Sequence, residues 1–144
     1  MILYRPVGLR ELELIAETGF REFPLRLAHQ RIFYPVLSFE YAEQIARDWN
    51  TKDPASSYCG FVRRFEIADS YARQSKVHTV GASLHRELWV PAEQLREFNE
   101  GLLKSISVAS SYYGGHFSPE IDEETGLPAH VAERYRSRRE GRCG

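Results

Sequence analysis

The sequence predicts an α+β fold made of two packed layers, and two observations carry this prediction. Segments with strand character and segments with helix character alternate at the start of the chain, and strands predominate afterwards. The 144 residues suffice for one domain with a sizeable core. A hydrophobic content of 42% and a charged content of 27% are ordinary for a globular protein, so we expect such a core to form.

The first part of the chain reads as two strand–helix units. Residues 2–7 form a β-prone run, and residues 9–17 carry apolar side chains at helical spacing. A long connection with few periodic positions covers residues 21–31, and connections of that length are often binding loops. Strand character resumes over residues 32–37, and an amphipathic helix is expected over residues 39–49.

The second part of the chain is richer in strands. Strands are expected over residues 59–67 and 77–80, and again in the apolar run that ends at Pro91, because proline cannot donate to a sheet ladder. Residues 98–101 read as a turn, and residues 102–112 read as the last strand.

From residue 116 onward the chain becomes polar, with an acidic stretch followed by several arginines. We therefore expect residues 1–115 to form the single domain and residues 116–144 to form a polar C-terminal tail. A short terminal helix over about residues 129–139 is the alternative for part of this tail.

Composition narrows the function classes. A formal net charge of -1 argues against a dominant nucleic-acid or membrane surface. The sequence contains no apolar run of the roughly 20 residues that a membrane span requires, and its start lacks the layout of a signal peptide. Two cysteines indicate no disulfide framework. We expect a cytoplasmic protein, with a secreted effector left open.

The commoner catalytic motifs are absent from the sequence. It has no phosphate-binding loop and no dinucleotide-binding glycine pattern after a strand. The 5 histidines are scattered, and no histidine or cysteine pair has the spacing of metal ligands. We therefore expect no metal site.

A few polar residues on strand-like segments remain as candidates. Glu87 adjoins an apolar run, where a carboxylate must be solvated, paired or used in function. His85 lies two residues before Glu87, so on a strand both side chains point to one face. Arg5 either satisfies a carbonyl or carboxylate of the protein or binds an anion through its rigid guanidinium fork.

Three segments together resemble the ADP-ribosyltransferase superfamily. The Leu-Tyr-Arg-Pro run at residues 3–6, followed by a helix and Thr-Gly-Phe at 18–20, is similar to the opening of cholera- and pertussis-type toxins. Tyr-Pro-Val-Leu-Ser at 34–38, leading into Tyr-Ala at 41–42, is similar to the middle motif of the superfamily. The stretch at 87–95 resembles the catalytic-glutamate strand, also as found in poly(ADP-ribose) polymerases.

The resemblance implies a fold of two packed, antiparallel-rich small sheets with flanking helices, with NAD as a substrate. It implies that Tyr4 and Arg5 form a cofactor-binding motif in which Arg5 holds a phosphate or ribose of NAD. It also implies that Tyr34 or Tyr41 packs on the nicotinamide, with Ser38 on the middle strand. Finally, it implies that Glu87 contacts the nicotinamide ribose and stabilises positive charge in the transition state, an interaction worth several kcal/mol.

Two departures from the toxin pattern keep alternatives open. The middle strand offers only Ser38 where the toxins carry Ser-Thr-Ser, and His85 occupies the place of their second acidic residue. The expected function is transfer of ADP-ribose to an unknown protein or nucleic-acid acceptor, or hydrolysis of NAD. The alternatives are a non-catalytic module that binds NAD, ADP-ribose or a cognate protein partner, and an end-processing enzyme similar to RNA 2′-phosphotransferases.

Overall fold

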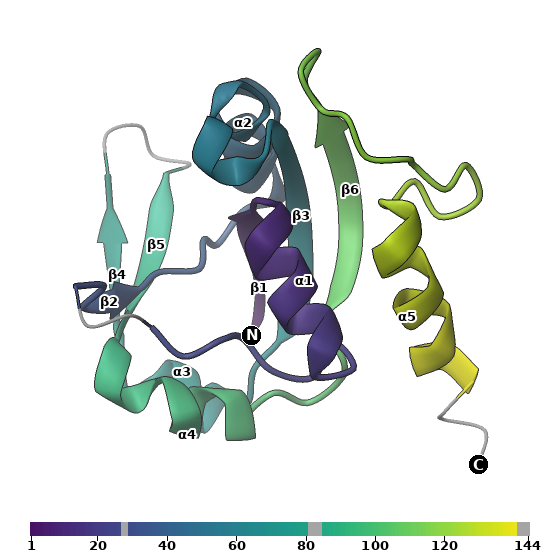
Figure 1. Ribbon diagram of the computed structural model, residues 1–144. Coiled ribbons are helices and arrows are strands. Elements are labelled where there is room, and N and C mark those ends of the chain that lie inside the picture. The colour runs from purple at the N-terminus through teal and green to yellow at the C-terminus, as the bar shows by residue number, and fades with distance from the viewer. Residues whose placement is uncertain (27–28, 81–84, 141–144) are drawn as a thin grey trace.

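The computed structural model describes residues 1–26, 29–80 and 85–140 (Figure 1). The strands are β1 Ile2–Val7, β2 Ile32–Phe33, β3 Cys59–Glu66, β4 Lys76–Thr79, β5 Arg86–Pro91 and β6 Ser107–Tyr113. The α-helices are α1 Leu9–Glu17, α2 Phe39–Asp48, α3 Asp69–Ala72, α4 Leu95–Glu100 and α5 Ala129–Glu140. Short 3-10 turns cover Asn50–Lys52, Pro54–Ser56 and Ala92–Gln94.

The strands form two small antiparallel sheets, so the predicted α+β class is confirmed at this level. One sheet has the order β1-β3-β6 and the other has the order β2-β5-β4. Val36 lies between the sheets and pairs with Tyr4 on one side and with Glu87 on the other. Segments that are distant in the sequence therefore lie next to one another along one row.

Pro35 explains why the expected strand over residues 32–37 is interrupted. Only Ile32–Phe33 forms a ladder, and Val36 makes isolated pairings beyond it. Proline has no N–H to donate, but the Pro35 carbonyl still accepts a 2.9 Å hydrogen bond from the Leu88 amide. The segment thus stays attached to β5 without continuing a regular strand.

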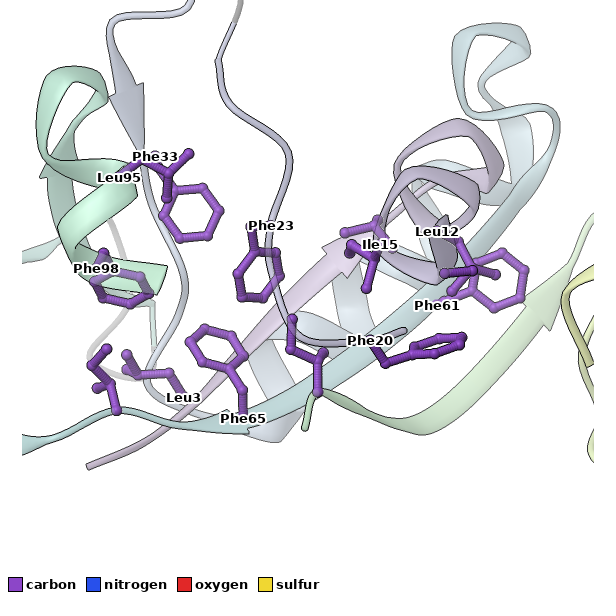
Figure 2. Packing of buried hydrophobic residues seen from close by; sticks show 14 of the residues in the cluster. Leu3, Leu12, Ile15, Phe20, Phe23, Phe33, Phe61, Phe65, Leu95 and Phe98 are labelled. Carbon is purple, nitrogen blue, oxygen red and sulfur yellow. The ribbon is translucent and has the colours of Figure 1, made fainter. Parts of the chain in front are cut away.

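The main core lies between the β1-β3-β6 sheet and the elements around it. Figure 2 shows Phe23 between Phe33 and Phe65, with Phe98 of α4 beside them. The ring centroids of Phe23 are 5.0 Å from Phe33 and 4.7 Å from Phe65. Tilted and edge-on aromatic contacts of this kind stabilise a core beyond the area that they bury.

Helix α2 begins where the sequence predicts. The Ser38 hydroxyl accepts a 3.2 Å hydrogen bond from the Tyr41 amide, which is the usual N-terminal cap. Ala42 and Ala46 pack with Val36 and Val62 in a second, smaller cluster. The cap therefore fixes the first turn of α2, and with it Tyr41, over the row formed by Tyr4, Val36 and Glu87.

The C-terminal region differs from the polar tail expected after residue 115. Leu127, Val131 and Ala132 are buried in the main core cluster. The ring of Tyr135 packs edge-on against Phe20, with centroids 5.0 Å apart. Helix α5 consequently belongs to the packed body of the protein, beside α1 and β6 (Figure 1).

Two local predictions for the segment between β5 and the end of β6 were wrong. Helix α4 occupies most of the segment expected to be a turn. The last strand begins only at Ser107, because the Leu103 and Ile106 amides donate singly to the carbonyls of Glu66 and Phe20. A backbone whose donors go to different partners cannot form a continuous ladder.

Candidate functional site

Glu87 lies in β5 on the face opposite the main core. Leu88 and Val90 are buried in that core, so strand alternation turns Glu87 and Trp89 to the other face. The residue is only 9% exposed. A carboxylate this deeply buried requires hydrogen-bond donors.

Two side chains supply these donors. The Tyr41 hydroxyl donates to Glu87 Oε2 at 2.6 Å, and Trp89 Nε1 donates to Oε1 at 3.0 Å. Burial, followed by the hydrogen bond to Glu87, raises the pKa of Tyr41 far above its ordinary value. The phenol therefore stays protonated and keeps donating, which holds the carboxylate in one orientation.

Two stacked ring pairs flank the carboxylate. His85 stacks on Tyr41 with centroids 4.4 Å apart, and its Nε2 lies 3.2 Å from Gln44 Oε1 of α2. His78 of β4 stacks on Trp89 with centroids 3.8 Å apart. His85 immediately precedes β5, and Glu87 and Trp89 follow it at every second residue, so the carboxylate lies between the two pairs. An oriented carboxylate in such a place can stabilise a developing positive charge.

Arg5 lies away from this cluster. Tyr4, Val36 and Glu87 are direct neighbours across the row and share a face, so alternation turns Arg5 to the opposite face. Its Nε and one Nη donate to the Glu11 carboxylate at 2.6 and 2.9 Å, and its guanidinium lies 4.7 Å above the Phe33 ring. Burial lowers the pKa of Arg5, but the charge and the hydrogen bonds of Glu11 act together against burial and leave that pKa raised.

The remaining predicted site residues lie around the row at different depths. The Tyr4 ring packs edge-on against Phe39. Tyr34 is 46% exposed. Ser38 uses its hydroxyl to cap α2. The structure thus brings together Glu87, His85 and Tyr41, while Tyr4 lies in the same row and Ser38 caps the helix that carries Tyr41.

A groove opens beside Trp89, with a volume of about 1050 Å³. The cationic side chains on its walls are Arg26, Arg31, Lys76 and Arg96. Glu93 and Glu97 are the carboxylates that line it, and His78 and Trp89 add aromatic surface. The indole of Trp89 therefore contacts the Glu87 carboxylate and also forms part of the groove.

Three comparisons with known proteins found no match for the chain. No family model, no curated protein and no solved structure matches it. Within the described ranges, no helix is long and apolar enough to cross a membrane. The same residues contain no group of three or more side chains suited to hold a metal ion.

Sequence reasoning missed several residues of this region. Trp89 could have been found, because a residue two positions from Glu87 on a strand must share its face. Gln44 and His78 could not, since their places depend on how α2 and β4 pack against β5. Arg26 lies in a connection without periodic pattern, and only the fold brings it near Arg5 and Glu11.

Proposed function

We propose that this protein is an ADP-ribosyltransferase-like enzyme that uses NAD and passes ADP-ribose to an acceptor or to water. The observation that carries the proposal is the row Tyr4, Val36 and Glu87. Each member comes from one of the three segments that resemble the superfamily. The three segments are far apart in the chain but adjacent in space, as residues of one site must be. This adjacency supports the inference that the resemblance extends to function.

The role of Glu87 in this proposal is electrostatic stabilisation of the transition state. The bond between the nicotinamide nitrogen and the anomeric carbon breaks, and nicotinamide leaves with the bonding pair. The acceptor oxygen or nitrogen then bonds to that carbon and loses a proton. Positive charge develops on the ribose during cleavage, and the Glu87 carboxylate, held by Tyr41 and Trp89, lies ready to stabilise it.

Arg5 is not part of the reacting group in this proposal. Its guanidinium is engaged by Glu11 on the opposite face from Glu87. Tyr34 and Tyr41 remain as rings that can pack on nicotinamide, because Tyr34 is exposed and Tyr41 lies beside the carboxylate. The site is therefore centred on Glu87, Tyr41 and His85.

The first test is release of nicotinamide from NAD by the purified protein and by Glu87→Gln. The amide keeps the size of the side chain and one of its two acceptor oxygens but removes the charge. We expect the rate to fall by about 10²–10³. Glu100→Gln is the matched control, since Glu100 is exposed on α4 and should leave the rate unchanged. Release that persists in Glu87→Gln would rule out the catalytic role.

A non-catalytic module that binds NAD or ADP-ribose is the second candidate. It is favoured by the internal partners of Arg5 and Glu87, which leave both groups engaged within the protein. Measuring both the melting temperature with ligand and the release of nicotinamide distinguishes the two candidate functions. Ligand that raises the melting temperature without any release of nicotinamide supports the module, because binding to the native state alone stabilises it.

A further inference from the structure

The groove beside Trp89 is lined by more cationic than acidic side chains. The whole chain has a formal net charge of -1. Four cationic side chains line the groove, Arg26, Arg31, Lys76 and Arg96, against the two carboxylates of Glu93 and Glu97. A concave surface of one sign concentrates the field and attracts ligands of the opposite sign.

Arg26 adds a second, independent observation. Its side chain is 11% exposed and lies 3.9 Å from Glu11, which already pairs with Arg5 at 2.6 Å. Two guanidiniums thus share one carboxylate. Burial, and then the charge of Arg5, lower the pKa of Arg26. In the part of the chain that the structure describes, Arg26 Nε is buried without a hydrogen-bond partner.

The groove also contains aromatic rings and has the volume of a small-molecule site. Trp89 and His78 line it, and aromatic side chains are the surfaces on which nucleic-acid bases stack. Its volume of about 1050 Å³ is at the upper end of the range of small-molecule pockets. Anion-binding side chains together with stacking rings suit a ligand that carries both a phosphate and a base.

The position of the groove distinguishes it from the site proposed for NAD. Along β5, His85 and Tyr41 lie on one side of Glu87, while Trp89 and the groove lie on the other. Nicotinamide packs on the tyrosine side in the proposed function. The second substrate must approach the same anomeric carbon from a different side. The groove provides such a side, because Trp89 lines it and also donates a hydrogen bond to the Glu87 carboxylate.

We propose that this groove is the acceptor site and that it binds a nucleotide phosphate with its base. The ligand is either a free nucleotide or the end of a single-stranded nucleic acid, and both present the same chemistry to the groove. The role of the groove as acceptor site rests on the proposed function. Binding of a nucleotide to the groove does not, and it can be measured without NAD.

The test uses a short single-stranded oligonucleotide with a 5′-phosphate and a 3′ fluorophore, followed by anisotropy over a range of salt concentrations. The double variant Arg31→Glu/Lys76→Glu reverses two exposed charges on the groove. Arg64→Glu/Lys104→Glu makes the same charge change at exposed positions that do not line it. We expect the groove variant to weaken binding by at least about tenfold and to reduce the salt slope by about 2.

Competition with AMP identifies the source of the ligand. Displacement of the oligonucleotide by AMP indicates a free nucleotide, and binding that resists AMP indicates a strand end. A Trp49→Phe variant leaves Trp89 as the tryptophan that reports on the groove, and its emission should change on binding. Equal loss in the groove variant and its control would overturn the inference. So would the absence of binding to either probe at low salt, which would be the result for a protein acceptor.

The two proposals can fail separately. Nicotinamide release that Glu87→Gln does not affect would remove the proposed catalysis, and oligonucleotide binding would still be decided by the groove variant. Conversely, release that depends on Glu87 in a protein without nucleotide binding would keep the catalysis and remove this acceptor.

Discussion

At the scale of single residues, the environment of Glu87 is set by two donors of different kinds. Tyr41 comes from α2 and Trp89 from β5 itself, so the carboxylate links a helix to a strand. A buried acceptor that loses a donor costs about 1–3 kcal/mol, because its desolvation is no longer offset. The same hydrogen bonds that orient Glu87 for chemistry therefore also contribute to stability.

Tyr41→Phe tests this dual role. The substitution removes the hydroxyl but keeps the ring that stacks on His85. We expect the free energy of unfolding to fall by about 1–2 kcal/mol, and nicotinamide release to fall by about tenfold because the carboxylate is less well oriented. Urea unfolding and the NAD assay measure the two effects. Tyr34→Phe is the control, since that ring is 46% exposed; an equal loss there would contradict the role given to Tyr41.

At the scale of elements, one ion pair holds α1 against β1. Arg5 of β1 and Glu11 in the first turn of α1 are both mostly buried, with side chains 11% and 20% exposed. The charges of Arg5 and then Arg26 lower the pKa of Glu11 despite its burial. Glu11 therefore accounts for the buried position of Arg5 without any ligand. The sequence alone could not distinguish this internal ion pair from an anion-binding role.

Glu11→Gln should be strongly destabilising. It leaves Arg5 and Arg26 close together without a countercharge, and breaking a buried pair from one side costs about 3–5 kcal/mol. The double variant Arg5→Met/Glu11→Leu should recover most of that loss, because it removes both charges and fills the space. Chemical denaturation measures each variant, with exposed Glu17→Gln as the neutral control. A double variant as unstable as the single one would contradict this account.

Elements with strong local signals were predictable. The helix over residues 9–17 and the Ser38 cap follow from periodicity and capping chemistry that act within one turn. The face shared by His85 and Glu87 follows from strand alternation alone. The pairing of Val36 with both Tyr4 and Glu87 could not be derived from local pattern, because it depends on contacts between distant segments.

At the scale of the whole molecule, the two ends of the sequence share one core. Phe20, which follows α1, packs against Tyr135 of α5. The Val108 amide of β6 donates a 3.3 Å hydrogen bond to the Tyr135 hydroxyl. The polar composition of residues 116–144 predicts a tail, but few apolar residues are needed to bury one face of a helix. Leu127, Val131 and Ala132 suffice here.

The final prediction tests whether α5 stabilises the whole fold. Val131 is 2% exposed in the main core, so Val131→Asp places a carboxylate where the structure buries an apolar side chain. We expect a loss of at least about 4 kcal/mol in the free energy of unfolding, which is a large share of the stability of a domain of this size. Arg134→Asp introduces the same side chain on the exposed face of α5, where surface changes are usually within about 0.5 kcal/mol. Urea unfolding compares the two, and equal midpoints would mean that the C-terminal region is a tail in solution.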